Sequence, residues 1–408
     1  MSELIDNRKL KIEQLTAYAL GVLDGENGAE LYRQYKTVLE TAEPRDVITV
    51  VDALVKTNEE MDEIKRAVNK ILNIFYEALK SKGKFEPREN GFLYFLMKEN
   101  REMEKRMDRL RARVKAIFKE KDPKNALLKL KDEIKGDLLD LQEYEKHYAK
   151  KENIFFPYFE KYFEDFRCLK VMWSMHDDAR RIIKSLLGNL DQDEPLISQF
   201  NMEIGKLYFS ILPLIFREEY ILYPMANRTL LPVHFEEMLL QSKEIGFSYI
   251  ELPEGFSFGD DAVKKQEDKA LESGLIDLGT GKLNVKEISM LFNHLPVDIT
   301  YVDENDEVKY FSTPKDRFFV RSGAIIGRKV QNCHPHESVD VVNKIVASFK
   351  SGEKSVATFW INIKGKFILI RYFAVHDDSG NYKGVLEVSQ DVTEIRKLEG
   401  ERRLLDWK

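Results

Sequence analysis

The chain has 408 residues, of which 43% are apolar and 33% are charged, and its formal net charge is −6. This acidic balance argues against nucleic acid as the main partner. The sequence has no uncharged apolar run of about 18 residues and no apolar core of signal-peptide length near its start, so we expect a cytoplasmic protein of two or three domains without a membrane span.

Residues 1–85 are predicted to form an all-α domain. Apolar residues recur at helical spacing, Pro44 and Asn58 mark helix starts, and Gly83 marks a stop. The function of this domain is not indicated by any motif in it.

Residues 86–250 hold four long amphipathic segments, at 92–122, 123–163, 171–189 and 195–230. An up-down four-helix bundle is the simplest packing for such segments with short connections. Residues 251–282 are rich in glycine and charge, which predicts a linker and the main site of limited proteolysis.

Residues 283–408 change to a β period. Two β-rich runs flank a turn near 303–307, a helical stretch follows at 337–352, and residues 358–392 predict three more strands. This order predicts an α+β sheet domain, so the fold class is multidomain, with two all-α regions before it.

The last residues, 393–408, return to a helical pattern. Ile395, Leu398 and Leu405 have roughly the spacing of a short coiled-coil seam. The segment is therefore predicted to form either a homodimer through this C-terminal helix or a helix packed on the domain's own sheet.

Two blocks of the predicted bundle repeat each other. Residues 147–161 and 214–228 align without a gap when Pro157 is set on Pro224. His147 of the first block then faces Leu214 of the second, so only one copy keeps a histidine.

Three parts of the chain resemble known families. The segment from 295 to 312, the closing strands and "DVTEIRKLEGE" at 391–401 resemble a PAS sensor domain with its signalling helix. The repeated helix ends, "FFP" and "LYP", resemble those of hemerythrin-like (HHE) domains. The N-terminal region resembles the uncharacterised helical domain found before these domains in bacterial and archaeal proteins.

The hemerythrin-like resemblance implies a pair of irons, held by imidazoles and bridging carboxylates inside the bundle. This sequence departs from that pattern. Lys151 replaces the glutamate expected after His147, and Leu214 replaces the histidine expected before Glu218. The repeat therefore indicates a bundle that keeps the scaffold of a metal site and has lost much of the site.

The candidate metal ligands that remain are His147, His176 and Glu218, with Glu152 and Glu219 nearby. They could hold one divalent ion, iron or zinc. The alternative, which the loss of ligands favours, is a set of structural polar residues in which Lys151 and Arg217 pair with Glu152 and Glu219.

The PAS-like region has its own candidate ligand site. Cys333 or His334 could bind haem, but the same residues fit a turn before a helix, with Pro335 near its first turn and Ser338 as its cap. We expect the turn rather than haem. Trp360, Phe367 and Tyr372 alternate along predicted strands and are candidates for the wall of a ligand pocket.

The resemblances imply a sensor that responds to a small molecule or a redox change and acts through a partner protein. The sequence has no catalytic dyad, phosphate-binding glycine loop or nucleotide signature, so an enzyme is not expected. The alternative is a metal-dependent protein that handles oxygen, nitric oxide or iron with the bundle itself.

Overall fold

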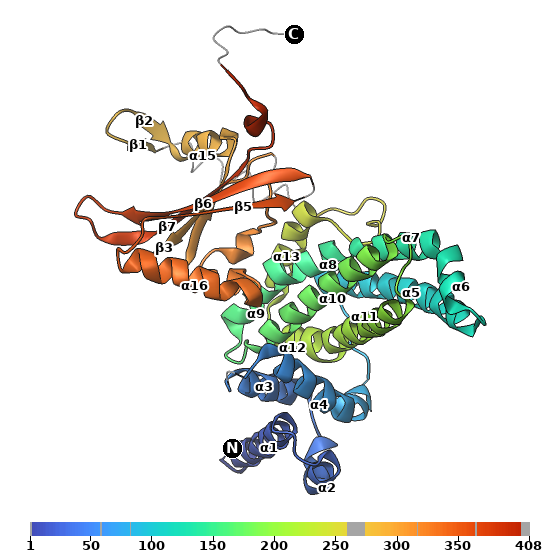
Figure 1. Ribbon diagram of the computed structural model, residues 1–408. Coiled ribbons are helices and arrows are strands. Elements are labelled where there is room, and N and C mark those ends of the chain that lie inside the picture. Colours follow the sequence, from blue (N-terminus) through green and yellow to red (C-terminus); the bar gives the residue numbers. More distant parts are fainter. Residues whose placement is uncertain are drawn as a thin grey trace. The chain divides into compact units, whose positions relative to one another are not determined.

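The computed structural model describes residues 2–57, 59–81, 83–258, 274–315, 317–363 and 365–400 (Figure 1). The chain divides into two compact units, a helical unit at residues 1–258 and a mixed unit at residues 259–408. Within the described residues, no helix combines the length and the apolar character needed to cross a membrane.

Four helices open the helical unit: α1 (Ser2–Leu23), α2 (Gly28–Leu39), α3 (Pro44–Val55) and α4 (Met61–Ser81). Their starts follow ordinary capping rules. The Asn27 side chain accepts hydrogen bonds from the first turn of α2, and Pro44 opens α3 behind a capping box of Glu43 and Asp46.

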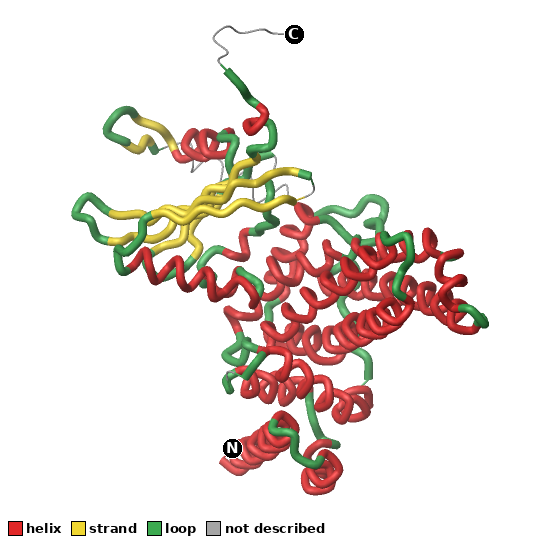
Figure 2. Tube along the Cα trace, in the orientation of Figure 1, coloured by secondary structure: helices red, strands yellow, loops and turns green. Residues whose placement is uncertain are grey.

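Four long helical segments then form the predicted bundle (Figures 1 and 2). The first is α5 (Phe92–Lys119) and the third is α10 (Cys168–Leu190). The second and fourth are interrupted helices. The second comprises α6 (Pro123–Lys129), α7 (Lys131–Gln142), α8 (Glu145–Lys150), η1 (Lys151–Phe155) and α9 (Phe156–Tyr162), and the fourth comprises α11 (Ile197–Arg217), η2 (Glu218–Leu222) and α12 (Tyr223–Thr229). Helix α13 (Pro232–Ile245) follows, and the predicted all-α architecture is confirmed.

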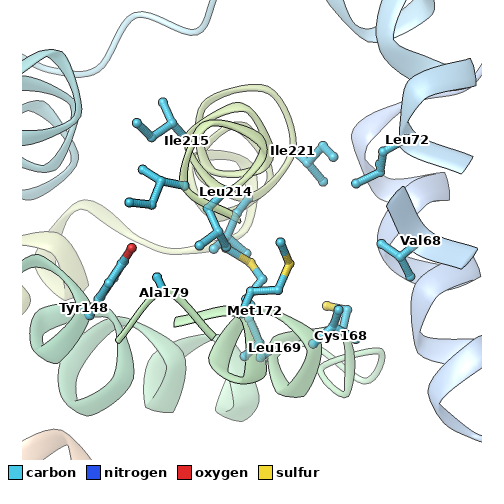
Figure 3. Packing of buried hydrophobic residues seen from close by; sticks show 14 of the residues in the cluster. Val68, Leu72, Tyr148, Cys168, Leu169, Met172, Ala179, Leu214, Ile215 and Ile221 are labelled. Atoms are coloured by element: carbon cyan, nitrogen blue, oxygen red, sulfur yellow. The ribbon is translucent and has the colours of Figure 1, made fainter. Parts of the chain in front are cut away.

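The N-terminal helices do not form a compact unit of their own, because one hydrophobic core, part of which is shown in Figure 3, runs from Leu15 to Met238. Thr49 donates to Asp165 at 2.7 Å, and Lys65 pairs with Asp178 at 2.5 Å. Helices α3 and α4 are amphipathic, so they bury their apolar faces against α10 and η2.

The predicted linker at 251–282 is shorter in the structure. Phe256 packs edge-on against Phe95 of α5, with ring centroids 5.3 Å apart, so residues 251–258 belong to the helical unit. Strands β1 (Leu275–Asp277) and β2 (Lys282–Asn284) form a hairpin at its other end. Residues 259–273 of the predicted proteolytic site lie outside the described residues.

The mixed unit is built on a five-stranded antiparallel sheet in the order β4-β3-β7-β6-β5 (Figure 2). The strands are β3 (Asp298–Asp303), β4 (Val308–Phe311), β5 (Val356–Ile363), β6 (Lys366–His376) and β7 (Tyr382–Asp391), and the main helices are α15 (Val285–His294) and α16 (His336–Lys350). Phe349 of α16 packs with Val302 and Val385 in the core on one sheet face. The predicted α+β fold is confirmed.

Gly384 of β7 has a φ of +134°, and a Cβ there would lie 2.0 Å from Val302 O. Only glycine therefore fits where β7 crosses close to β3.

The predicted C-terminal helix does not form within the described residues. After β7 the chain makes one 3₁₀ turn, η5 (Ile395–Lys397), and Leu398 is already extended. The reason is local: Thr393 bonds to Asp391, and the Arg396 guanidinium lies 3.9 Å from the centre of the Phe367 ring. Leu405, and with it the rest of the predicted dimer seam, lies outside the described residues.

Candidate functional site

The two repeated blocks adopt the same backbone. Each leaves the α-helical register for one π-helical turn, η1 in the first block and η2 in the second. Pro157 and Pro224 follow at the starts of α9 and α12 and lack the N–H that a continuing α-helix needs. Single π turns of this kind are frequent at functional sites, and here both begin at a buried charged residue.

A buried ion pair joins the two blocks. Lys151 Nζ donates to Glu218 Oε1, and Glu218 Oε2 lies 3.2 Å from His147 Nε2. Asn100 Nδ2 at 3.1 Å and the Tyr223 hydroxyl at 2.9 Å donate to the same oxygen. Burial opposes ionisation of Glu218, but Lys151 and His147 outweigh it and hold the pKa of that carboxyl well below its usual range.

A second buried pair lies beside the first. Lys150 Nζ donates to Glu99 Oε1 and to Gly246 O, both at 2.7 Å, and the Ser248 backbone N–H donates to Glu99 Oε1 at 2.7 Å. His147 Nδ1 lies 2.7 Å from Glu99 Oε2. Burial opposes ionisation of Glu99, but Lys150 and His147 lower the pKa of that carboxyl below its usual value.

His147 therefore lies between two carboxylates, those of Glu99 and Glu218. A neutral imidazole donates from one nitrogen only, so both contacts are hydrogen bonds when the ring is protonated.

His176 has a different environment. Its Nδ1 lies 2.7 Å from Glu152 Oε1, and its ring stacks on Tyr148 with centroids 4.3 Å apart. Burial lowers the pKa of His176 well below its usual value, and the charges of Lys151 and Arg180 add to this effect. The neutral ring donates to Glu152, and its buried Nε2 has no hydrogen-bond partner among the described residues.

The predicted pairings of Glu152 and Glu219 are wrong. Lys151 reaches across to Glu218 instead of bonding its neighbour Glu152, which pairs with Arg180 at 3.0 Å as well as with His176. Glu219 pairs with Arg101 and, at 3.2 Å, with Lys84. Residues two positions apart on a helix point in different directions, so Glu219 faces α5 while Arg217 faces α4 and α10.

The five residues proposed as metal ligands thus divide into two groups. His147, Glu218 and Glu219 share one network, in which the Asn100 amide donates to both glutamates at 3.1 Å, and His176 and Glu152 share another.

A metal ion does not fit these residues as they stand. Each imidazole keeps a carboxylate on its Nδ1, as metal-bound histidines do. However, the Lys151 ammonium already bonds the Glu218 carboxylate that a metal would need. Within the described residues, no group of three or more His, Cys, Asp or Glu side chains has the arrangement of a metal site.

Sequence reasoning missed Glu99, Asn100, Lys150 and Ser248, all of them buried. Glu99 and Asn100 stand on the apolar face of α5, between the core residues Leu96 and Met103. Two adjacent polar residues on such a face are a signal of a buried network. Ser248 lies far away in sequence and carries no such signal.

The mixed unit holds a separate polar cluster. Arg321 Nη2 donates to both oxygens of Glu387 on β7, at 3.1 and 3.2 Å. Burial lowers the pKa of His334 and raises the pKa of Tyr372, and the charges of Glu387 and Arg321 act on both. The two predicted ligand-binding residues His334 and Tyr372 therefore lie near one ion pair.

The other predicted pocket residues do not join this cluster. Trp360 pairs in register with Leu369, so it shares a sheet face with Phe367, whereas Tyr372 lies on the core face. Trp360 is 63% exposed on the edge strand β5. The prediction of one aromatic pocket wall is wrong, because alternation along a strand does not tell which face is covered.

Cys333 and His334 lie where the chain turns into α16. Cys333 Sγ donates to Lys329 O at 3.6 Å, and α16 begins at His336, directly after Pro335. Ser338 lies within the first turn, where its N–H and its hydroxyl both donate to Pro335 O, so it is not the cap that the sequence suggested.

Two family models match the chain. Residues 91–226 match the hemerythrin HHE cation binding domain, and residues 288–393 match a PAS domain. A comparison with curated proteins finds no match.

Solved structures give further similarities. A C-terminal domain from Streptococcus mutans is 31% identical, with 31% of this chain and 99% of that chain covered and a TM-score of 0.30. A sensory box sensor histidine kinase from Vibrio cholerae is 16% identical, with 26% and 89% covered and a TM-score of 0.21. The PAS domain of a protein from Colwellia psychrerythraea is 13% identical, with 27% and 98% covered and a TM-score of 0.22.

The N-terminal helices lie outside both family matches, and their resemblance to the uncharacterised domain stays a prediction. The bundle and the sheet domain each agree with the family that matches them in extent and in fold. The chain is therefore a protein that combines a hemerythrin HHE domain with a PAS domain.

Proposed function

We propose that this protein is a sensor in which the Lys151 ammonium has replaced the metal of the hemerythrin-like bundle. The observation that supports the proposal is the bond from Lys151 Nζ to Glu218, at equivalent positions of the two repeated blocks. A buried ammonium supplies the positive charge that Glu218 needs, without the open coordination positions at which a metal binds oxygen.

The replacement of the metal by Lys151 keeps the buried charges of the bundle balanced. The ammonium groups of Lys150 and Lys151 face the carboxylates of Glu99 and Glu218. A divalent cation added between them would meet two like charges at close range, which opposes its binding. The bundle is then a rigid scaffold in place of an oxygen carrier.

The PAS domain receives the signal in this proposal. Its largely buried Arg321–Glu387 pair, whose side chains are 14% and 11% exposed, has His334 and Tyr372 nearby and offers polar groups to a small molecule. Arg321 Nε has no hydrogen-bond partner among the described residues. Binding changes the conformation of the domain, and a partner protein receives that change. We expect no catalytic step and a cytoplasmic location.

Purified full-length protein tests this proposal. We expect substoichiometric metal and no haem or diiron absorption, together with a copurifying organic molecule that mass spectrometry detects after denaturation. Arg321→Ala should lose that molecule, whereas Arg371→Ala, on the opposite face of β6 from Tyr372, should keep it. Stoichiometric iron, or an organic molecule retained equally by Arg321→Ala, would contradict the proposal.

The second candidate is a metal-dependent protein that handles oxygen, nitric oxide or iron. The observation that favours it is the neutral His176, whose unpartnered Nε2 and Glu152-bound Nδ1 match the state of a metal-binding imidazole. Metal analysis of the unmutated protein separates the two candidates.

A further inference from the structure

Asp298, the first residue of β3, is a buried carboxyl group without a hydrogen bond. It is 2% exposed, and neither of its oxygens has a hydrogen-bond partner among the described residues. Burial raises the pKa of Asp298, and the charge of Glu387 acts in the same direction. The charges of Arg321 and Arg317, and the nearby backbone amide of Phe319, act against this shift without reversing it. A buried carboxyl group in such surroundings is less costly when it is protonated.

The register of the sheet makes Asp298 and Glu387 diagonal neighbours. Thr300 of β3 lies opposite Glu387 of β7, and Asp298 lies opposite Ser389. Residues two positions apart on a strand share a face, so both carboxyl groups lie on the face that carries the core residue Val302. Diagonal neighbours on an antiparallel sheet are about 7–8 Å apart. One long arginine side chain can therefore reach either carboxyl group.

Arg321 pairs with only one of these two carboxyl groups. Its Nη2 donates to both oxygens of Glu387, at 3.1 and 3.2 Å, whereas its Nε has no partner in the part of the chain that the structure describes. The Arg321 carbonyl accepts a hydrogen bond from Arg317 Nη1 at 3.0 Å, which holds the backbone from which the Arg321 side chain extends. A guanidinium with a free donor thus lies near one paired and one unpaired carboxyl group.

We propose that Arg321 is a two-position switch, which exchanges its ion pair between Glu387 of β7 and Asp298 of β3. In the position of this structure, Glu387 is the ion-pair partner and Asp298 carries a proton. In the other position Arg321 bonds Asp298, which has passed its proton to Glu387. The exchange moves one guanidinium and one proton between two carboxyl groups and leaves the net charge unchanged. Neither position therefore leaves an unpaired charge in the core.

The exchange gives the PAS domain two conformations between which a signal can select, and this role rests on the proposed sensor function. Arg321 belongs to the segment between β4 and α16, which contains the 3₁₀ turns η3 (Gly323–Ile325) and η4 (Val330–Cys333). A ligand that contacts Arg321, or the carboxyl group that Arg321 leaves free, binds the two positions with different affinities. It therefore shifts their populations and changes the segment that leads into α16.

Urea denaturation of the full-length protein tests the exchange without a ligand. Pulsed hydrogen exchange with mass spectrometry, measured on peptides of β3 and β7, gives the midpoint of the PAS domain alone. Asp298→Asn by itself removes an unpaired carboxyl group and should leave the midpoint unchanged or raise it. Glu387→Gln should transfer Arg321 to Asp298. Asp298→Asn in that background removes the remaining counterion, so it should lower the midpoint by about 1 M.

Two further variants make the test specific to Arg321. When Arg321→Met is combined with Glu387→Gln, Asp298→Asn should no longer lower the midpoint, because no guanidinium is left to lose its partner. Asp378→Asn is the matched control, since Asp378 is an exposed residue of the turn between β6 and β7. It should have the same small effect with and without Glu387→Gln.

The proposal is overturned if Asp298→Asn has the same effect on the midpoint with and without Glu387→Gln, or if its effect in that background persists after Arg321→Met. A Glu387→Gln variant that does not fold also overturns it, because the exchange supplies Asp298 as the new counterion. None of these results depends on a bound molecule or on metal content, so failure here is separate from failure of the proposed sensor function.

Discussion

Lys151 and Glu218 hold equivalent positions in the two repeated blocks, and the ammonium of one donates to the carboxylate of the other. Each residue begins a π-helical turn ahead of a proline, so the backbone repeats while the charge is reversed. The asymmetry of the repeat therefore has a structural consequence. Opposite charges at equivalent positions join the second and fourth helical segments of the bundle.

Removing the ammonium alone should destabilise the helical unit strongly. Lys151→Met leaves the buried Glu218 carboxylate without its cation, and we expect a loss of about 3–5 kcal/mol in the free energy of unfolding. Urea denaturation followed by helical circular dichroism measures it.

Two controls accompany this prediction. Lys151→Met combined with Glu218→Met should recover part of the loss, because neither charge is then left alone. Lys124→Met breaks the exposed pair with Glu194 and should change stability little. A cost for Lys151→Met as small as that for Lys124→Met would contradict the assigned ion pair.

His176 should make the stability of the helical unit depend on pH. Burial holds the pKa of His176 below its value in the unfolded chain, so the unfolded state binds the proton first. Its contribution to stability is full above the unfolded pKa of about 6.5 and is lost as the pH falls below it, by up to about 1.4 kcal/mol per pH unit.

His176→Gln removes this contribution, so its stability should fall less steeply than that of the unmutated protein between pH 7 and 5. Denaturation curves across this range measure the difference. Identical slopes for the His176 variant and the unmutated protein would show that His176 is not held neutral.

The two faces of the PAS sheet should respond differently to truncation. Tyr372 packs on the core, so Tyr372→Ala should cost about 3–5 kcal/mol, whereas the exposed Trp360→Ala should change stability by about 0.5 kcal/mol or less. Chemical denaturation followed by the sheet signal distinguishes them. Equal costs would mean that Trp360 is buried in the folded protein.

Patterns with a local origin could be predicted from the sequence. The helix spacing of α5 and α10, the strand period of β6 and the terminal prolines of the repeat all follow from neighbouring residues. The attachment of α3 and α4 to the bundle depends on contacts such as Thr49 with Asp165, more than a hundred residues apart, and no local pattern contains it.

The candidate site could also be predicted only in part from the sequence. His147, His176 and Glu218 stand out by residue type on a helical face, but their partners are set by packing. Glu99 meets Lys150 and Ser248 only once three segments come together.

Metal content tests the replacement of the cation by Lys151 most directly. Full-length protein, Lys151→Met and Lys151→Glu are each loaded with iron(II) or zinc, desalted and analysed for metal together with their absorption spectra. The account predicts substoichiometric metal in the unmutated protein and a clear gain in Lys151→Glu, which removes the ammonium and restores a carboxylate ligand, with Lys151→Met gaining less. Two irons per chain with an oxo-bridge absorption band in the unmutated protein would contradict it.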